Sequence, residues 1–184
     1  MLNSIKWVTQ MNNVESKIRY KSLPKIVDTL INNVRTVEAI GCRHSQLLAG
    51  CRDDDINGTL IAFIERLVTE VHRPFTISYS HTGRHSTVVK ALCKLGWIKV
   101  PNQWATIKHP ETDSFIHFNC GELSCIRGRL YDLIIVEKQS HIYTDDDLVT
   151  TSSCLHRNGN ILLATNNPDF NVKLDVDEIF MPHV

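Results

Sequence analysis

Residues 126–138 read Ile-Arg-Gly-Arg-Leu-Tyr-Asp-Leu-Ile-Ile-Val-Glu-Lys, and this stretch decides the fold that the sequence predicts. Its centre, Leu133 to Val136, is a continuous apolar run with an acidic residue on each side. A half-exposed strand alternates apolar and polar side chains, whereas a strand in a parallel sheet is covered on both faces. The run therefore predicts a buried parallel strand.

Helical and strand patterns alternate on both sides of this run. The spacing of apolar residues predicts helices over residues 23–40, 59–68, 83–96 and 145–155. Apolar segments predict strands at residues 46–49, 75–79 and 161–164, and a turn between residues 104–107 and 115–118 predicts a hairpin. This order predicts an α/β fold in three layers, with a mostly parallel central sheet and an inserted β-hairpin. We expect an N-terminal arm over residues 1–22 and one domain over residues 23–184.

Charge is balanced over the whole chain but not along it. Residues 1–100 carry 14 Lys and Arg against 8 Asp and Glu, and residues 101–184 carry 6 against 12. The net charge is therefore +6 for residues 1–100 and −6 for residues 101–184. Two mixed surfaces of one domain are the simpler interpretation, and a basic patch for nucleic acid on the first part stays open.

The six cysteines include no C-x-x-C pair, and no His or Cys group follows them at zinc-finger spacing. We therefore expect free, buried thiols in a reducing compartment. The chain also has no signal-peptide core and no apolar run long enough to span a bilayer. These features predict a cytoplasmic protein without a membrane partner.

Four segments, in this order, resemble the ATPase core of phage terminase large subunits and related helicases, which has the P-loop NTPase fold. Residues 47–59 resemble the strand, Gly-rich loop and helix of a Walker A motif, and residues 77–80 resemble the next strand. Residues 126–138 resemble the stretch that ends in the Walker B acid pair, and residues 162–168 the Thr-containing motif after it. The resemblance implies a phage-derived motor ATPase fold in the host cytoplasm, with a cleft for ATP and Mg²⁺.

The Walker A resemblance lacks the residues that bind phosphate. The motif G-x-x-x-x-G-K-[ST] needs glycines for the loop, a lysine on the phosphates and a hydroxyl on Mg²⁺. Here Asn57 takes the place of the second glycine and Gly58 that of the lysine, while Thr59 keeps the hydroxyl. Carboxylates in the loop repel a triphosphate, each by roughly 1 kcal/mol at 4 Å in water. The degenerate positions are Gly50, Asp53, Asp54, Asp55, Asn57, Gly58 and Thr59.

The Walker B resemblance is altered as well. Glu137 occupies the metal-holding position, and Lys138 replaces the glutamate that positions the attacking water. An ammonium cannot act there as a base. We therefore expect no catalytic residue and no cofactor, with ATP and Mg²⁺ binding as the alternative.

Asp53, Asp55 and Asn57 match the first half of a calcium loop. The twelfth position of that loop is Ile64, where a bidentate glutamate belongs. An acidic first turn of a helix explains the same residues more simply, as it does residues 145–147. No metal is the expectation, with calcium as the alternative.

Two groups of basic residues are candidate contacts for nucleic acid or a protein partner. Arg127 and Arg129 flank Gly128 just before the Walker-B-like strand, where salt bridges to acidic residues explain them equally well. Lys17, Arg19 and Lys21 lie in the predicted arm, which can instead be simply solvated.

Two functions remain open. The first is a catalytically inactive P-loop ATPase-like protein, a binding or regulatory module in a DNA transaction or host-takeover complex, with a protein partner and possible nucleic-acid contact. The second is a divergent or trans-complemented ATPase of the terminase or helicase type. The acidic loop favours the first, because another subunit could supply a lysine but could not remove three carboxylates.

Overall fold

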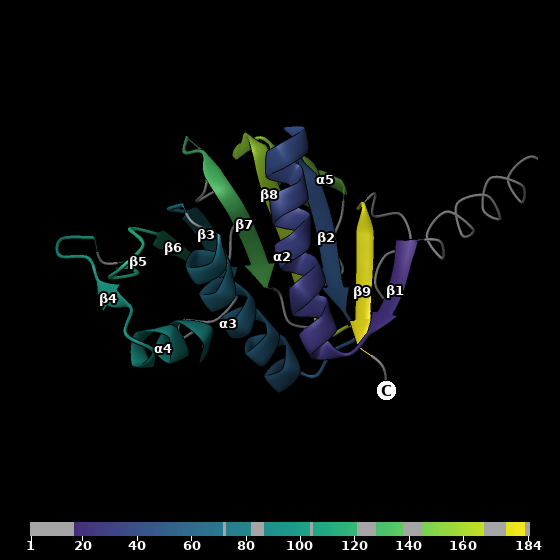
Figure 1. The fold of residues 1–184 in the computed structure, drawn as a ribbon, viewed down its shortest axis with the longest axis horizontal. Helices are drawn as coiled ribbons and strands as arrows, with labels where there is room; N and C mark the ends of the chain where they lie inside the picture. The colour runs from purple at the N-terminus through teal and green to yellow at the C-terminus, as the bar shows by residue number, and fades with distance from the viewer. Residues whose placement is uncertain are drawn as a thin grey trace, which may run out of the picture.

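A mostly parallel β-sheet with helices packed against it forms the protein (Figure 1). The computed structural model describes residues 17–71, 73–81, 87–103, 105–120, 128–137, 145–167 and 176–182. The helices are α2 (Leu23–Ile40), α3 (Asp53–Glu70), α4 (Thr87–Lys94) and α5 (Asp145–Ser152). The strands are β1 (Ile18–Lys21), β2 (His44–Ala49), β3 (Thr76–His81), β4 (Ile98–Lys99), β5 (Thr106–Lys108), β6 (Phe115–Cys120), β7 (Tyr131–Glu137), β8 (Leu155–Thr165) and β9 (Glu178–Pro182).

The nine strands of the described ranges lie in the order β1-β9-β2-β8-β7-β3-β6-β5-β4. Neighbours from β1 to β6 are parallel, and β5 pairs antiparallel with both β6 and β4. The run from Leu133 to Val136 lies in β7, and none of its four side chains is more than 1% exposed. The predicted buried parallel strand and the α/β class with a mostly parallel sheet are confirmed.

Two apolar clusters cover the two faces of the sheet. The larger cluster joins α2, α3 and α4 to one face, through side chains such as Ile26, Leu60 and Leu92. The smaller cluster joins Leu148 of α5 to the opposite face, where it meets β2, β7 and β8. In Figure 1, α2 and α3 cross in front of the strands and α5 lies behind them.

Helix α2 agrees with its prediction at both ends. Pro24 lies in the first turn, where its missing N–H costs nothing, and Gly41 ends the helix with φ of +75°. All six apolar residues that predicted the helix are buried. They are Ile26, Val27, Leu30, Ile31, Val34 and Val37.

Helix α3 differs from its prediction. The sequence predicts a loop over residues 50–58 and a helix from Thr59, but the helix begins at Asp53. Three aspartates in the first turn favour the exposed amides and the positive end of the helix dipole. Ile56 is only 2% exposed, so its burial favours the early start. The predicted loop was therefore wrong, and the interpretation of these aspartates as the acidic first turn of a helix is confirmed.

The two edges of the sheet also differ from the prediction. Residues 18–21, assigned to the arm, form β1, which pairs in parallel with β9, a strand that was not predicted. The predicted hairpin is confirmed as the β5–β6 pair, but β4 extends it and β6 joins the main sheet beside β3. Strand β8 begins six residues before the predicted Ile161. Helix α5 ends at Ser152, three residues before the predicted end.

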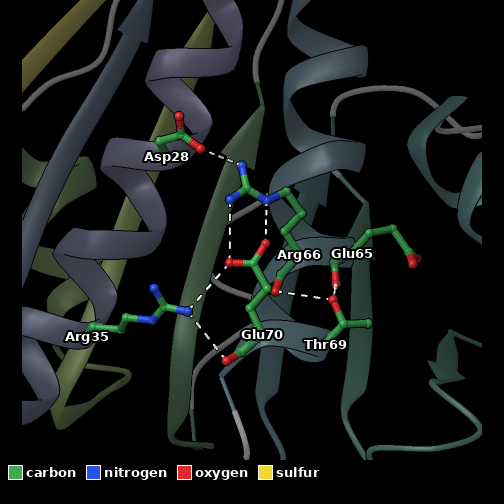
Figure 2. A network of polar contacts seen from close by, with 6 residues as sticks. All are labelled: Asp28, Arg35, Glu65, Arg66, Thr69 and Glu70. Carbon is green, nitrogen blue, oxygen red and sulfur yellow. Dashed lines mark hydrogen bonds and ion pairs between the residues drawn. The ribbon is translucent and has the colours of Figure 1, made fainter.

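An ion-pair network joins the exposed surfaces of α2 and α3 (Figure 2). Arg66 binds Glu70 on its own helix at 2.5 Å and Asp28 on α2 at 2.6 Å. Arg35 reaches Glu70 at 3.4 Å. The hydrogen bond from Arg66 holds the pKa of Glu70 below its ordinary value. Exposed pairs of this kind contribute at most about 1 kcal/mol each, so the network orients Arg66 more than it stabilises the fold.

A second network ties Glu178 of β9 to two other elements. Its carboxylate accepts a 2.6 Å hydrogen bond from Asn33 of α2 and lies 3.4 Å from the Nε2 atom of His44 on β2. The contact with His44, followed by the one with Asn33, holds the pKa of Glu178 below its ordinary value of 4.5. The ionised carboxylate therefore stabilises the folded state.

We expect this stabilisation, about 1 kcal/mol, to be present at neutral pH and to be lost as the pH falls below 4.5. The sign follows because a lowered folded-state pKa means that the unfolded chain takes up the proton first. Urea unfolding between pH 7 and pH 3 should show a shallower acid decline for Glu178→Gln than for the unchanged protein. Glu111→Gln, at an exposed position, is the control, and identical slopes for all three proteins would contradict the prediction.

Candidate functional site

The carboxyl ends of four parallel strands meet at one edge of the sheet. Ala49 of β2 is paired with Thr165 of β8, and Glu137 of β7 is paired with both Ala164 of β8 and His81 of β3. The chain leaves β2 for strands on one side of it and later returns as β9 on the other side. Such a change of direction at the carboxyl edge is where parallel α/β sheets bind ligands.

Glu137 is the most deeply buried acid of this edge, at 4% exposure. One carboxylate oxygen accepts a hydrogen bond from the Tyr79 hydroxyl, and the other lies 3.5 Å from the Nε2 atom of His81. A buried carboxylate needs such partners, because burial without them costs several kcal/mol. Both oxygens of Glu137, which the resemblance placed at a metal-holding position, thus have partners on β3.

The connection between β2 and α3 is three residues long, Gly50, Cys51 and Arg52. Gly50 takes the left-handed conformation, with φ of +68°, and α3 begins immediately afterwards. A phosphate loop places four residues between its two glycines and begins its helix at the second one. The structure has no room for that loop between Ala49 and Asp53.

The remaining Walker-A-like positions lie within α3. Asn57, Gly58 and Thr59 occupy its second turn. The Thr59 side chain is 3% exposed, and its hydroxyl donates a 2.7 Å hydrogen bond to the carbonyl oxygen of Asp55. This hydroxyl therefore stabilises the helix and does not point to the sheet edge as a metal ligand would.

The three aspartates divide between two environments. The Oδ1 atom of Asp53 accepts a 2.9 Å hydrogen bond from Asn166, the residue after β8. Asp54 and Asp55 instead line an open groove between α3 and α2, together with Gly58 and Thr59. The acidic run thus faces both the sheet edge and the helix pair.

Cys51 lies beside this acidic run, and its thiol is unreactive. Burial, followed by the charge of Asp55, raises the pKa of its thiol to about 12. The thiol keeps its proton at neutral pH, and a thiol is a poor nucleophile and metal ligand compared with a thiolate. Cys42, Cys51, Cys93 and Cys154 are free, as predicted.

Arg129 lies far from this edge. It precedes β7, whereas Glu137 ends that strand, so the length of a seven-residue strand, roughly 20 Å, separates them. Burial lowers the pKa of His117, and the charge of Arg129 lowers it further. The same guanidinium lies near the Tyr131 hydroxyl. Arg127 and Lys138 lie outside the described residues.

The basic residues near the N-terminus gather at the outer strand of the sheet. Lys17 and Arg19 flank Ile18 at the start of β1, and Lys21 donates a 2.7 Å hydrogen bond to Thr29 of α2. A hollow of about 440 Å³ adjoins the junction between β1 and α2. Its lining residues are Tyr20, Lys21, Ser22, Lys25, Asp28 and Thr29.

The candidate calcium ligands lie in helical geometry. Asp53, Asp55 and Asn57 belong to the first two turns of α3, not to a loop. Within the ranges that the structure describes, no group of three or more His, Cys, Asp and Glu side chains is arranged to hold a metal ion.

Comparison with protein-family models and with curated proteins gives no match to this chain. No helix among the described residues is both long and apolar enough to cross a membrane.

The Tyr79–Glu137 contact predicts a stability change. Tyr79→Phe should lower the free energy of unfolding by about 1–3 kcal/mol, because Glu137 stays buried without its donor. Glu137→Gln should lower it too, and the double variant should cost less than the sum of the two. Tyr20→Phe, at a side chain 58% exposed, is the control in urea unfolding. Additive effects of the pair would show that the two side chains do not interact.

Proposed function

We propose that the chain is a P-loop ATPase-like domain of the terminase or helicase type, phage-derived, that does not hydrolyse ATP. It acts as a binding or regulatory module in a DNA transaction or a host-takeover complex. The observation that carries the proposal is the three-residue connection between β2 and α3, followed by three aspartates. A nucleotide site in this fold depends on that connection more than on any other segment.

The strand order supports the proposed ancestry. The Walker-A-like strand β2 and the Walker-B-like strand β7 are separated by β8, with β3 beyond β7 and β9 on the other side of β2. In this order the two motif-bearing strands lie one strand apart in the middle of the sheet. The same order places the end of β7, with Glu137, near the start of α3, as the resemblance implies.

Two features of the site oppose nucleotide binding. The N-terminal amides of α3 would meet a triphosphate among carboxylates, each repelling it by roughly 1 kcal/mol even in water. Both oxygens of Glu137 already have partners on β3, so a metal ion would have to displace them.

The alternative, a divergent or trans-complemented ATPase, requires a larger change. To form a phosphate loop, α3 would have to unwind from Asp53 to Gly58. Unwinding would withdraw Ile56 from the core, at a cost of about 1.5–3 kcal/mol, and would break the bond from Thr59 to Asp55. Another subunit could supply a lysine and a glutamate, but it could not avoid this cost.

We expect no binding when ATP with Mg²⁺ is titrated into the full chain in a calorimeter at neutral pH. The acidic first turn of α3 repels the triphosphate, and without a phosphate loop no backbone amides surround its charge. Micromolar binding that is lost in both Thr59→Val and Glu137→Gln would establish the alternative. Arg157→Ala, at an exposed position on β8, is the control for a loss of ATP binding that any substitution would cause.

A polynucleotide is the second candidate ligand, favoured by Tyr20, Lys21 and Lys25 around one hollow. Binding there should weaken as salt rises, and each lysine removed should reduce the slope by roughly 1. Retention of single-stranded DNA is measured for the unchanged chain, for Lys21→Ala with Lys25→Ala, and for Lys94→Ala as an exposed control. Absence of salt-dependent retention removes this candidate.

A further inference from the structure

An open groove of about 340 Å³ lies between α2 and α3, and we call it the α2–α3 groove. Most of its surface is apolar, supplied by Leu23, Pro24 and Val27 of α2 and by Ala62 of α3. Its complete lining is Leu23, Pro24, Val27, Asp54, Asp55, Gly58, Thr59, Ala62 and Arg66. An apolar groove between two helices is a common docking site for a segment of another protein.

Gly58 is the residue of the groove that the fold itself does not explain. It lies in the second turn of α3 and has an ordinary helical backbone, where glycine costs about 1 kcal/mol relative to alanine. A Cβ atom at this position would meet no other atom within 4 Å, so packing does not exclude a side chain. A glycine here leaves the helix backbone open to close approach by another chain.

The groove has an acidic rim. Asp54 and Asp55 border it, and within the described ranges no Lys or Arg side chain forms an ion pair with either of them. Arg66, the one cation of the lining, is already bound by Asp28 and Glu70 (Figure 2). Within the lining, two unpaired aspartates therefore stand against one arginine that is already bound, and their complement is a cationic ligand.

We infer that the α2–α3 groove binds a protein segment whose apolar side chains are flanked by Lys or Arg. This inference rests on the proposed function and gives the binding module its class of partner. Apolar side chains would cover Leu23 and Ala62, the segment's backbone would pass over Gly58, and its cations would pair with Asp54 and Asp55. The chain's own residues 1–16 are a poorer complement, since they hold one basic residue, Lys6, and one acidic residue, Glu15.

Three amidated hexapeptides test the inference against the full chain. The probe is Lys-Arg-Leu-Leu-Lys-Arg, and its two controls replace the leucines by serine or the basic residues by glutamate. We expect the probe to bind at least about tenfold more tightly than either control, and its binding to weaken with salt. Fluorescence anisotropy gives the affinities, and NMR shifts of the Val27 and Ala62 amides locate the site.

Variants of the chain separate the groove from other surfaces. Gly58→Gln fills the groove while improving helix propensity, and it should weaken the probe at least about tenfold without loss of thermal stability. Asp54→Asn with Asp55→Asn should also weaken the probe at least about tenfold and should reduce the salt dependence of its binding. Thr36→Gln, exposed on α2 outside the groove, should change nothing.

Several results would overturn the inference. These are no probe binding at millimolar concentration, equal binding of the three peptides, or unchanged binding to Gly58→Gln. Self-association that Gly58→Gln abolishes would identify a second copy of the chain as the occupant instead. Tighter probe binding after deletion of residues 1–16 would identify that segment. The ATP titration is independent of all these outcomes, so a failure here leaves the loss of the nucleotide site untouched.

Discussion

The burial of Ile56 determines how the polar residues of this protein are arranged. Ile56 precedes Leu60, Phe63 and Leu67 on the buried face of α3, and none of the four is more than 2% exposed. The spacing continues one helical stripe into the first turn, so the helix must already be formed at Asp53. Once α3 begins there, only three residues remain to connect it to β2.

The early start of α3 decides where each nearby side chain points. It places Asp54, Asp55 and Gly58 against α2, and it leaves the Thr59 hydroxyl to bond within the helix. Glu137, with no loop opposite it, takes its partners from β3.

Local patterns in the sequence predicted the interior of the fold but not its edges. The apolar run from Leu133 to Val136 and the apolar stripe of α2 predict their elements well, because the residues of both are buried in the core. Strands β1 and β9 are short, and they depend on each other and on β2 for pairing, which no local pattern records. The two interpretations of residues 53–57 had different outcomes: the helix start at Thr59 was wrong, whereas the acidic first turn of a helix is confirmed.

The candidate site was predictable in part. The resemblance implied that Glu137 and Asp53 lie at one site. The parallel register brings the end of β7, with Glu137, next to β8, whose end lies beside the end of β2, and Asp53 contacts Asn166 just after β8. Tyr79 and His81 were missed, although their spacing on β3 contains a signal. Residues two apart on a strand share a face, so once β3 and β7 are neighbours both side chains lie on the face of Glu137.

If the chain has the proposed ancestry, the missing phosphate loop and the groove beside α2 both follow from where α3 begins. A helix that begins early gives up the loop amides that would surround a phosphate, and it adds one and a half turns of exposed helix surface beside α2. Acidic residues suit the new helix start because they favour its dipole, and the same charges form the rim of the groove. A glycine in that added surface lowers helix stability, so its presence is better explained by what approaches the helix from outside than by the fold.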